Sequence, residues 1–373
     1  MTALAFVVLV LMAFFTFNLS FLNPIKRVIQ EFSMTELYWQ MQLDMNDYKS
    51  SQLITIVDMT ELTERADLAM TLEAIESCEP KVIGVDMVFP GLKEDTLGDN
   101  MIRDVAATYD NIIWSLKLGE YVDDETGYGA PIRSFFVEET GCTEAVTMMQ
   151  RSFLSGVKRK LIQGWLLQGE LKPSFAGTVV NTYSEREVVP TKDAELTIDF
   201  TPTKFVVVPW ESVLQNADLL ADRIVLFGAM HEDADMHVTP LGTIAGLELL
   251  AYAVQTKIKE HQVYEVDGVL LWGISFLIVA LTFWGRSLRK RWIEKRRRPE
   301  QRLILGFPII ASLISFIWIA LITLMAYILF SKYEISFNLG YAFSAIAFLG
   351  TAESSYNTIL DYIKEKINEN AEQ

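Results

Sequence analysis

The segments Leu53-Ile-Thr-Ile-Val-Asp58 and Lys81-Val-Ile-Gly-Val-Asp86 decide the fold of most of this chain. Both are rich in β-branched residues, which is typical of buried strands. Residues 64–78, which lie between them, carry apolar side chains at helical spacing. A strand, a helix and a second strand in so short a stretch indicate a βαβ unit, so the sequence predicts a mostly parallel sheet with helices on its faces.

The rest of this region continues the α/β pattern. Runs with strand composition recur at residues 112–116, 177–181, 196–200 and 223–227. The last run leads through Gly228 into a loop, and helical spacing resumes at residues 245–259. We therefore expect one α/β domain over residues 24–266.

Four apolar runs lie outside that domain, at residues 3–22, 268–285, 303–330 and 335–351. A helix rises about 1.5 Å per residue, so runs of this length approach the roughly 30 Å of a bilayer's hydrocarbon core. The sequence predicts one N-terminal and three C-terminal transmembrane helices. None of the runs contains Asp, Glu, Lys, Arg or His, which argues against a transporter.

The basic segment at residues 286–302 predicts the orientation. It holds nine Lys and Arg against two Glu, and such loops stay on the cytoplasmic side. The large domain is then expected outside the cytoplasm and the C-terminus inside. The resulting division is a transmembrane anchor at 1–23, the extracytoplasmic domain at 24–266, a three-helix membrane region at 267–351 and a cytoplasmic tail at 352–373.

The N-terminal run lacks the basic residues that usually precede an anchor. We therefore expect that the start of the chain is incomplete or misassigned. An uncleaved anchor is favoured because no small-residue cleavage site follows the run. A cleaved signal peptide is the alternative.

Charge and cysteine content limit the partners of the large domain. The chain carries a net charge of −16, and residues 24–266 alone hold 20 Lys and Arg against 39 Asp and Glu. So acidic a domain is a poor partner for nucleic acid. The chain's two cysteines, Cys78 and Cys142, both fall in this domain. They could form a disulfide there, or they could both be free thiols.

Two carboxylates stand where ligands gather in parallel sheets. Asp58 and Asp86 each follow a predicted strand, and ligands bind at the carboxyl ends of such strands. The alternative is structural, because Asp at this position often caps the following turn or helix.

The densest polar cluster is the segment 228–242. It contains His231, Asp233, Asp235 and His237, whose donor atoms suit a divalent metal. Their spacing fits no established metal motif, so a structural or ligand-contacting loop is the alternative. The chain has no nucleotide-binding or nucleophile motif, and we expect neither catalysis nor a cofactor.

Several of these segments, taken in order, resemble the CHASE domain of the second type, the cyclase/histidine-kinase-associated sensory extracellular family. The resemblance covers roughly residues 21–262 and rests on residues 54–58, 81–89, 223–228, 235–242 and 245–248. It implies a bacterial sensory module in the cytoplasmic membrane that signals rather than catalyses. The family's Asp-x-His-x-Thr-Pro segment maps onto Asp235, His237, Thr239 and Pro240, and its acidic strand ends map onto Asp58 and Asp86. The chain departs from the family after the first strand, at residues 60–65.

The residues after the last apolar run are too few for a kinase or cyclase domain. A sensor of this kind is expected to pass its state to a separate effector protein. Two alternatives stay open: a structural or scaffolding envelope protein that forms homo-oligomers, and a metal-dependent periplasmic enzyme.

Overall fold

The computed structural model describes residues 34–94, 96–149, 157–186, 190–231, 235–259, 263–336 and 339–372. The chain divides into two compact units. One is Trp39–Val263, and the other joins Tyr264–Gln373 to the described residues up to Tyr38. Helix α3 (Met34–Asp44) leads into the first strand.

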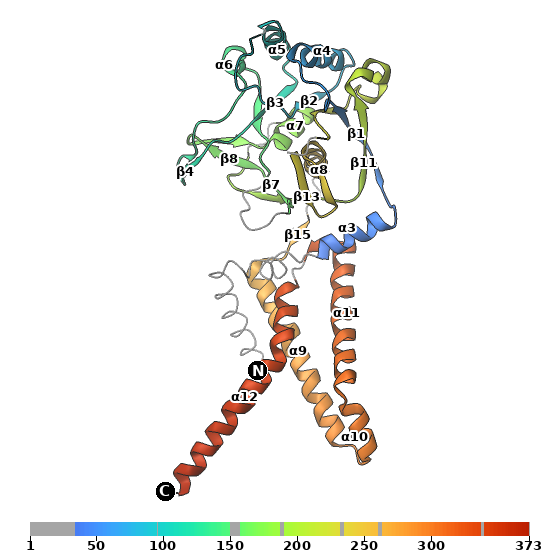
Figure 1. Ribbon diagram of the computed structural model, residues 1–373, viewed down its shortest axis with the longest axis vertical. Coiled ribbons are helices and arrows are strands. Elements are labelled where there is room, and N and C mark those ends of the chain that lie inside the picture. The colour runs from blue at the N-terminus through green and yellow to red at the C-terminus, as the bar shows by residue number, and fades with distance from the viewer. Residues whose placement is uncertain are drawn as a thin grey trace. The chain divides into compact units, whose positions relative to one another are not determined.

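The centre of the first unit is a six-stranded sheet in the order β11-β1-β12-β2-β3-β6 (Figure 1). Every neighbouring pair in it is parallel. The strands are β1 (Lys49–Asp58), β2 (Val82–Val85), β3 (Ile112–Leu116), β6 (Glu144–Val146), β11 (Thr203–Pro209) and β12 (Ile224–Gly228). The predicted α/β class and parallel sheet are confirmed, with β12 lying between the two strands of the first βαβ unit.

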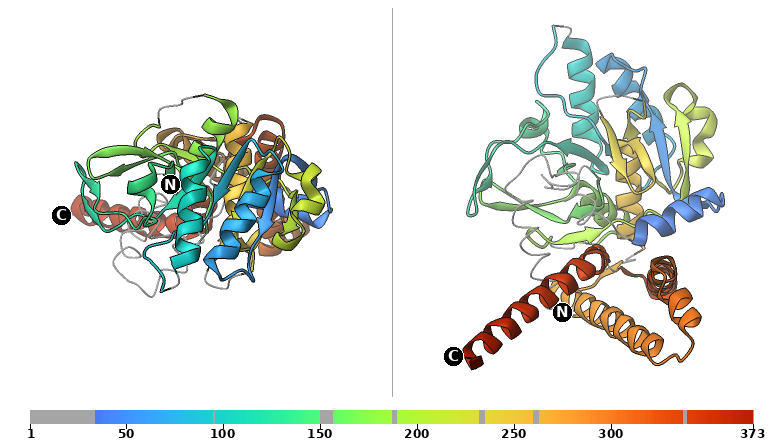
Figure 2. Two further views of the ribbon diagram at one scale, coloured as in Figure 1. Left: turned by 90° about the horizontal axis from the view of Figure 1, so that it is seen from above. Right: turned by 60° about the horizontal axis from the view of Figure 1, so that its bottom comes forward.

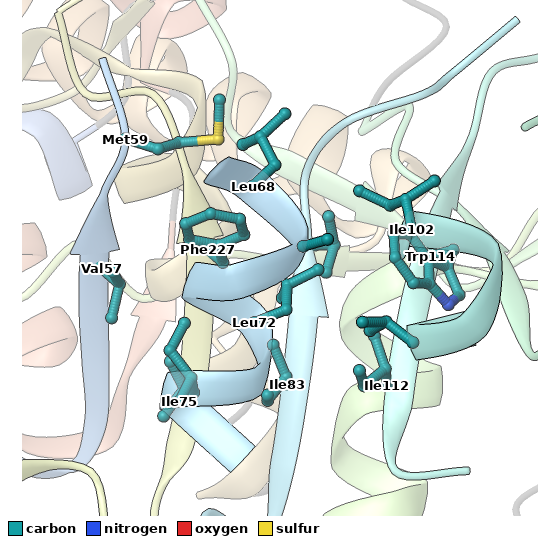
Figure 3. Packing of buried hydrophobic residues seen from close by; sticks show 14 of the residues in the cluster. Val57, Met59, Leu68, Leu72, Ile75, Ile83, Ile102, Ile112, Trp114 and Phe227 are labelled. Atoms are coloured by element: carbon teal, nitrogen blue, oxygen red, sulfur yellow. The ribbon is translucent and has the colours of Figure 1, made fainter. Parts of the chain in front are cut away.

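Helices cover both faces of this sheet because successive side chains of a strand point to opposite sides. Ile83 and Val85 of β2 pack in the core formed with α4 (Arg65–Glu76) and α5 (Thr96–Thr108). Figure 3 shows this core, and Figure 2 shows the two helices together along one side of the sheet. Gly84 faces the other way, where a Cβ would meet Phe175 of α7 (Phe175–Ser184) at 2.8 Å. Helix α8 (Gly246–Ile258) packs with α7.

Two of the predicted strands are wrong in whole or in part. Residues 177–181 lie in helix α7, which begins because the Ser174 hydroxyl caps it by accepting from the Gly177 amide. Of residues 196–200, only the first two are in strand β10 (Glu195–Thr197). The strand ends before Asp199, whose carboxylate accepts from the amide and hydroxyl of Thr201. Apolar composition alone could not distinguish these local choices.

Smaller sheets surround the central one. β4 (Tyr121–Asp123), β5 (Gly127–Tyr128), β8 (Gly164–Leu167) and β9 (Glu170–Pro173) form a four-stranded sheet. Antiparallel pairs join β7 (Lys160–Ile162) with β10, and β13 (Met236–Thr239) with β14 (Gly242–Ala245). Short helical turns complete the unit: α6 (Val137–Thr140), η2 (Trp210–Ser212) and η3 (Leu214–Leu219).

A buried ion pair fastens α4 to α5. The Arg65 guanidinium contacts the Asp99 carboxylate, whose side chain is 1% exposed. The Lys93 amide also donates to Asp99, at 2.7 Å. The rings of Phe89 and Phe135 lie 5.5 and 5.4 Å from the Arg65 guanidinium carbon. The buried charge of Asp99 is thus paired with a cation and accepts a backbone hydrogen bond.

The second unit contains long apolar helices. Within the described residues, Gly268–Glu294 and Ser312–Tyr333 are long and apolar enough to cross a membrane. The first is α9, which begins where the Asp267 carboxylate accepts from the Val269 amide. The second belongs to α11 (Pro308–Tyr333). Trp318 Nε1 of α11 donates to the Thr282 hydroxyl of α9 at 2.9 Å. The predicted anchor at residues 3–22 lies outside the described residues.

The remaining segments of this unit are more helical than expected. The basic segment 286–302 is not a long loop, because α9 runs to Glu294 and α10 (Pro299–Gly306) follows soon after. Two short strands, β15 (Tyr264–Glu265) and β16 (Ile335–Ser336), pair in parallel. The predicted last span and tail share one continuous helix, α12 (Gly340–Glu372).

Candidate functional site

A cavity of about 350 Å³ lies at the carboxyl ends of β2, β3 and β12. This is the edge of a parallel sheet where ligands gather, because strands end there and the following loops leave a crevice. The lining residues come from these strand ends, from β13, from the residues after β6 and from the first turn of α8: Asp86, Met87, Val88, Ser115, Lys117, Thr147, Met149, Ala229, Asp235, His237, Gly246, Leu249 and Leu250.

Asp86, the residue that follows β2, is the enclosed carboxylate of this cavity. Its amide donates to the Phe227 carbonyl at 2.9 Å, which fixes the residue against β12. Burial and, to a smaller extent, the charge of Asp235 together raise the pKa of Asp86 to about 6, against the opposing effects of Ser115, Lys117 and His237. The protonation state of Asp86 is therefore sensitive to anything that enters the cavity.

His237 reaches the cavity from β13, and Asp235 reaches it from the position just before that strand. The two side chains lie close together, with Asp235 Oδ1 at 3.3 Å from His237 Nε2. The Asp235 carboxylate also lies against Gly246, where a Cβ would collide with it. Gly246 is the first residue of α8, whose N-cap residue Ala245 provides no side-chain cap. A carboxylate beside a helix N-terminus is stabilised by the positive end of the helix dipole.

Two predicted site residues lie outside the cavity lining. Asp58 Oδ1 accepts from the Thr60 amide at 2.9 Å and from the Met230 amide at 3.2 Å, so it connects the loops after β1 and β12. Thr239 is buried, and its hydroxyl donates to the Gly242 carbonyl at 2.8 Å across the β13–β14 turn. These hydrogen bonds indicate that Asp58 and Thr239 stabilise loops and turns of the fold rather than contact a ligand in the cavity.

The described residues do not form the cluster of metal ligands that the metal hypothesis requires. Asp233 lies outside the described residues. His231 Nε2 is 3.8 Å from Asp58 Oδ2, and His231 is not among the residues that line the cavity, whereas His237 is. Among the described residues, no three His, Cys, Asp or Glu side chains are placed to hold a metal ion.

Several lining residues escaped the sequence analysis. Ser115 lies near the end of the predicted strand at 112–116 and Lys117 directly follows it, so the rule that ligands gather at strand ends could have pointed to them. Thr147 and Met149 follow the short strand β6, which no sequence pattern indicated.

The cysteines are both free thiols in the structure. Cys78 is buried at the end of α4, where burial raises the pKa of its thiol. Cys142 is partly buried and packs against the same core, and burial raises its pKa as well. The structure therefore agrees with the alternative of free thiols and not with a disulfide between Cys78 and Cys142.

The chain was compared with models of known protein families. Residues 3–287 match the family model described as the CHASE2 domain. The match covers most of the chain and includes the whole central sheet, the cavity and the first two apolar runs. No curated protein and no solved structure matches the chain.

Proposed function

Since this chain belongs to the CHASE2 family of sensory extracellular domains, we propose that it is a bacterial membrane sensor whose α/β unit binds a small molecule. The ligand-binding site is the cavity at the carboxyl ends of β2, β3 and β12. The bound state is relayed to a separate effector protein, and the chain itself is not an enzyme.

One observation carries this proposal. Asp86 is far in the sequence from Asp235 and His237, yet all three line one cavity at the edge of the sheet. A concave site on which a few polar groups converge is the usual form of a small-molecule site. Such a site is one means by which a sensory domain receives a chemical signal.

The proposal is tested by filling the cavity without changing its charge. Ala229 lines the cavity, so Ala229→Phe reduces its volume, whereas Ala221→Phe places the same ring on an exposed residue. The melting temperature of the full-length protein in detergent is measured against a library of small metabolites. We expect compounds that raise the melting temperature of the wild type and of Ala221→Phe, but not that of Ala229→Phe. Stabilisation that persists in Ala229→Phe contradicts the proposed site.

The membrane arrangement is part of the proposal. The two apolar helices that could span a bilayer and the basic residues between 286 and 302 support a multi-pass protein of the cytoplasmic membrane. The α/β unit lies outside the cytoplasm, and the basic segment and the C-terminus lie inside. Four spans, at residues 3–22, 268–285, 303–330 and 335–351, complete the topology.

Cysteine labelling in intact cells tests this orientation. Val122 is 56% exposed in β4, and Lys295 lies in the basic segment. In a background without Cys78 and Cys142, Val122→Cys is expected to react with a membrane-impermeant maleimide in intact cells. Lys295→Cys is expected to react only after lysis, and the reverse pattern contradicts the orientation.

The relay to an effector is tested by affinity purification. The intact chain is compared with a form that ends after Thr351, which removes the C-terminal part of α12. We expect a cytoplasmic protein to accompany the intact chain and to be lost from the shorter form. Envelope proteins alone, recovered equally with both forms, would favour a scaffold instead.

A further inference from the structure

The proposed ligand site places two carboxylates close enough to affect each other. The charge of Asp235 raises the pKa of Asp86, which is the effect of a like charge across a short distance. The other titratable groups that act on Asp86 among the described residues are Lys117 and His237. Lys117 makes no ion pair with either carboxylate within the described part of the chain. Among the described residues, the Asp235 carboxylate contacts one basic side chain, His237, at 3.3 Å, whereas the Asp86 carboxylate is in ion-pair contact with none.

Asp86 also lacks a dedicated hydrogen-bond donor. The described donor to its side chain is the Ser115 hydroxyl, at 3.2 Å. That hydroxyl lies closer to the Val85 carbonyl, at 2.7 Å, and it has only one proton to donate. A carboxylate can accept about four hydrogen bonds, so Asp86 has capacity left on the side that faces the cavity.

We infer that the ligand of this cavity is a small organic molecule with a protonated primary amine, which binds between Asp86 and Asp235. An ammonium group has three N–H donors and a positive charge. It supplies the donors that Asp86 lacks and removes the repulsion between the two carboxylates. This inference rests on the proposed function, because it assumes that the cavity is the ligand site.

The remaining lining residues indicate the size and polarity of the part of the ligand that carries the amine. Met87, Val88, Met149, Leu249 and Leu250 give the cavity an apolar side. A volume of about 350 Å³ lies at the lower end of the range for small-molecule sites. The site therefore fits an amine with a short branched or linear hydrocarbon body.

Two other ligand classes fit the site less well. A metal ion needs its donor atoms to converge to within about 2.0–2.6 Å of one point, and the described residues offer no such group of three. An anion would face both carboxylates, and Asp235 already lies beside the first turn of α8, where an anion would otherwise bind.

Calorimetric titration of the full-length protein in detergent, at about pH 8, tests the inference with three probes that share one hydrocarbon body. Isoamylamine carries the amine, isoamyl alcohol is its neutral counterpart, and isocaproate is its anionic counterpart. The variants are Asp86→Asn and Asp235→Asn, with Asp58→Asn as the matched carboxylate outside the cavity. The melting temperature of each variant establishes that it is folded. If Asp86→Asn does not fold, the affinity of Asp235→Asn alone is compared with that of the wild type.

We expect isoamylamine to bind the wild type and Asp58→Asn with equal affinity. We expect its affinity to fall by about tenfold or more in Asp86→Asn and in Asp235→Asn, and the alcohol and the carboxylate to bind at least about tenfold more weakly than the amine. Amine binding that neither cavity substitution weakens overturns the inference.

The outcomes separate the inference from the proposed function. If the alcohol or the carboxylate binds as tightly as the amine, and Ala229→Phe abolishes that binding, the amine inference fails and the ligand site stands. If none of the three probes binds, the amine inference fails. The melting-temperature comparison of Ala229→Phe with Ala221→Phe against the metabolite library then decides whether the cavity is a ligand site.

Discussion

The carboxylate of Asp235 occupies the space that a side chain at Gly246 would need. Asp235 lies just before β13, and Gly246 is the first residue of α8. The absence of a side chain at Gly246 therefore permits a charged group of the cavity to lie beside the N-terminus of a helix. Glycine is required here for close approach and not for a left-handed backbone.

Gly246→Ala is expected to displace the Asp235 carboxylate without changing any charge. Affinity for isoamylamine should fall by about tenfold, because the ammonium group loses one of its two carboxylates. The melting temperature should change little, because alanine favours helix and the displaced carboxylate is the mobile end of its side chain. Titration calorimetry and thermal melting of the same preparation measure both effects.

Gly268→Ala is the matched control for that substitution. Gly268 is the first residue of α9, and a Cβ there meets nothing within 4 Å. This variant should bind the amine as the wild type does. Equal affinities of the two glycine variants would contradict the role given to Gly246.

Asp86→Asn is expected to change stability in a pH-dependent way. Folding raises the pKa of Asp86 from 3.8 to about 6, chiefly through burial, so the folded protein holds this proton more tightly than the unfolded chain. The group's stabilising contribution is then full below pH 4 and is lost as the pH rises through 6. Asparagine has no proton to lose. At pH 8 the variant should be more stable than the wild type by about 2 to 3 kcal/mol, and near pH 4 the difference should vanish.

Chemical unfolding of both proteins between pH 4 and pH 8 measures this difference. A stability difference that does not vary with pH would mean that Asp86 titrates alike in the folded and unfolded states. A variant that is less stable than the wild type at pH 8 would also contradict the prediction.

Arg65→Met should destabilise the α/β unit strongly. The substitution leaves the Asp99 carboxylate buried without its cation, and loss of one member of a buried pair costs about 3 to 5 kcal/mol. Lys172→Met breaks the exposed pair with Glu170 and should change stability little, because exposed ion pairs contribute little to stability. Free energies of unfolding from denaturant titrations compare the two, and equal losses would contradict the assignment of Arg65 and Asp99 as the buried pair.

Asp58→Ala should weaken the fold without weakening ligand binding. It removes the acceptor for the Thr60 and Met230 amides, with an expected loss of about 1 to 3 kcal/mol. Asp58→Asn keeps an acceptor oxygen and should lose less. A selective loss of amine affinity in Asp58→Ala, with stability unchanged, would instead place Asp58 in the ligand site.

Much of the fold could be predicted because its signals are local. The runs at residues 53–58, 81–86, 112–116 and 223–227 are short, apolar and β-branched, and all four coincide with strands of the central sheet. The same signal was ambiguous at 177–181, where the cap at Ser174 decided for helix. The sequence also gave no sign that β12 lies between β1 and β2, because strand order depends on long-range pairing.

The candidate site was predictable only in part. Asp86, Asp235 and His237 were identified from strand ends and from the family resemblance, and the structure brings them to one cavity. Asp58 occupies an equivalent strand end, yet its hydrogen bonds to Thr60 and Met230 give it a structural place. Which of two similar carboxylates faces a cavity depends on the loops packed around them, and a pattern of residues along the chain does not encode that directly.

Hydrogen exchange of the full-length protein, with and without the library compound that stabilises it most, tests the central claim most directly. The account predicts slower exchange in the segments that line the cavity, after β2, after β3 and from β13 into the first turn of α8. Slower exchange confined to other segments of the α/β unit, with the cavity segments unchanged, would contradict it.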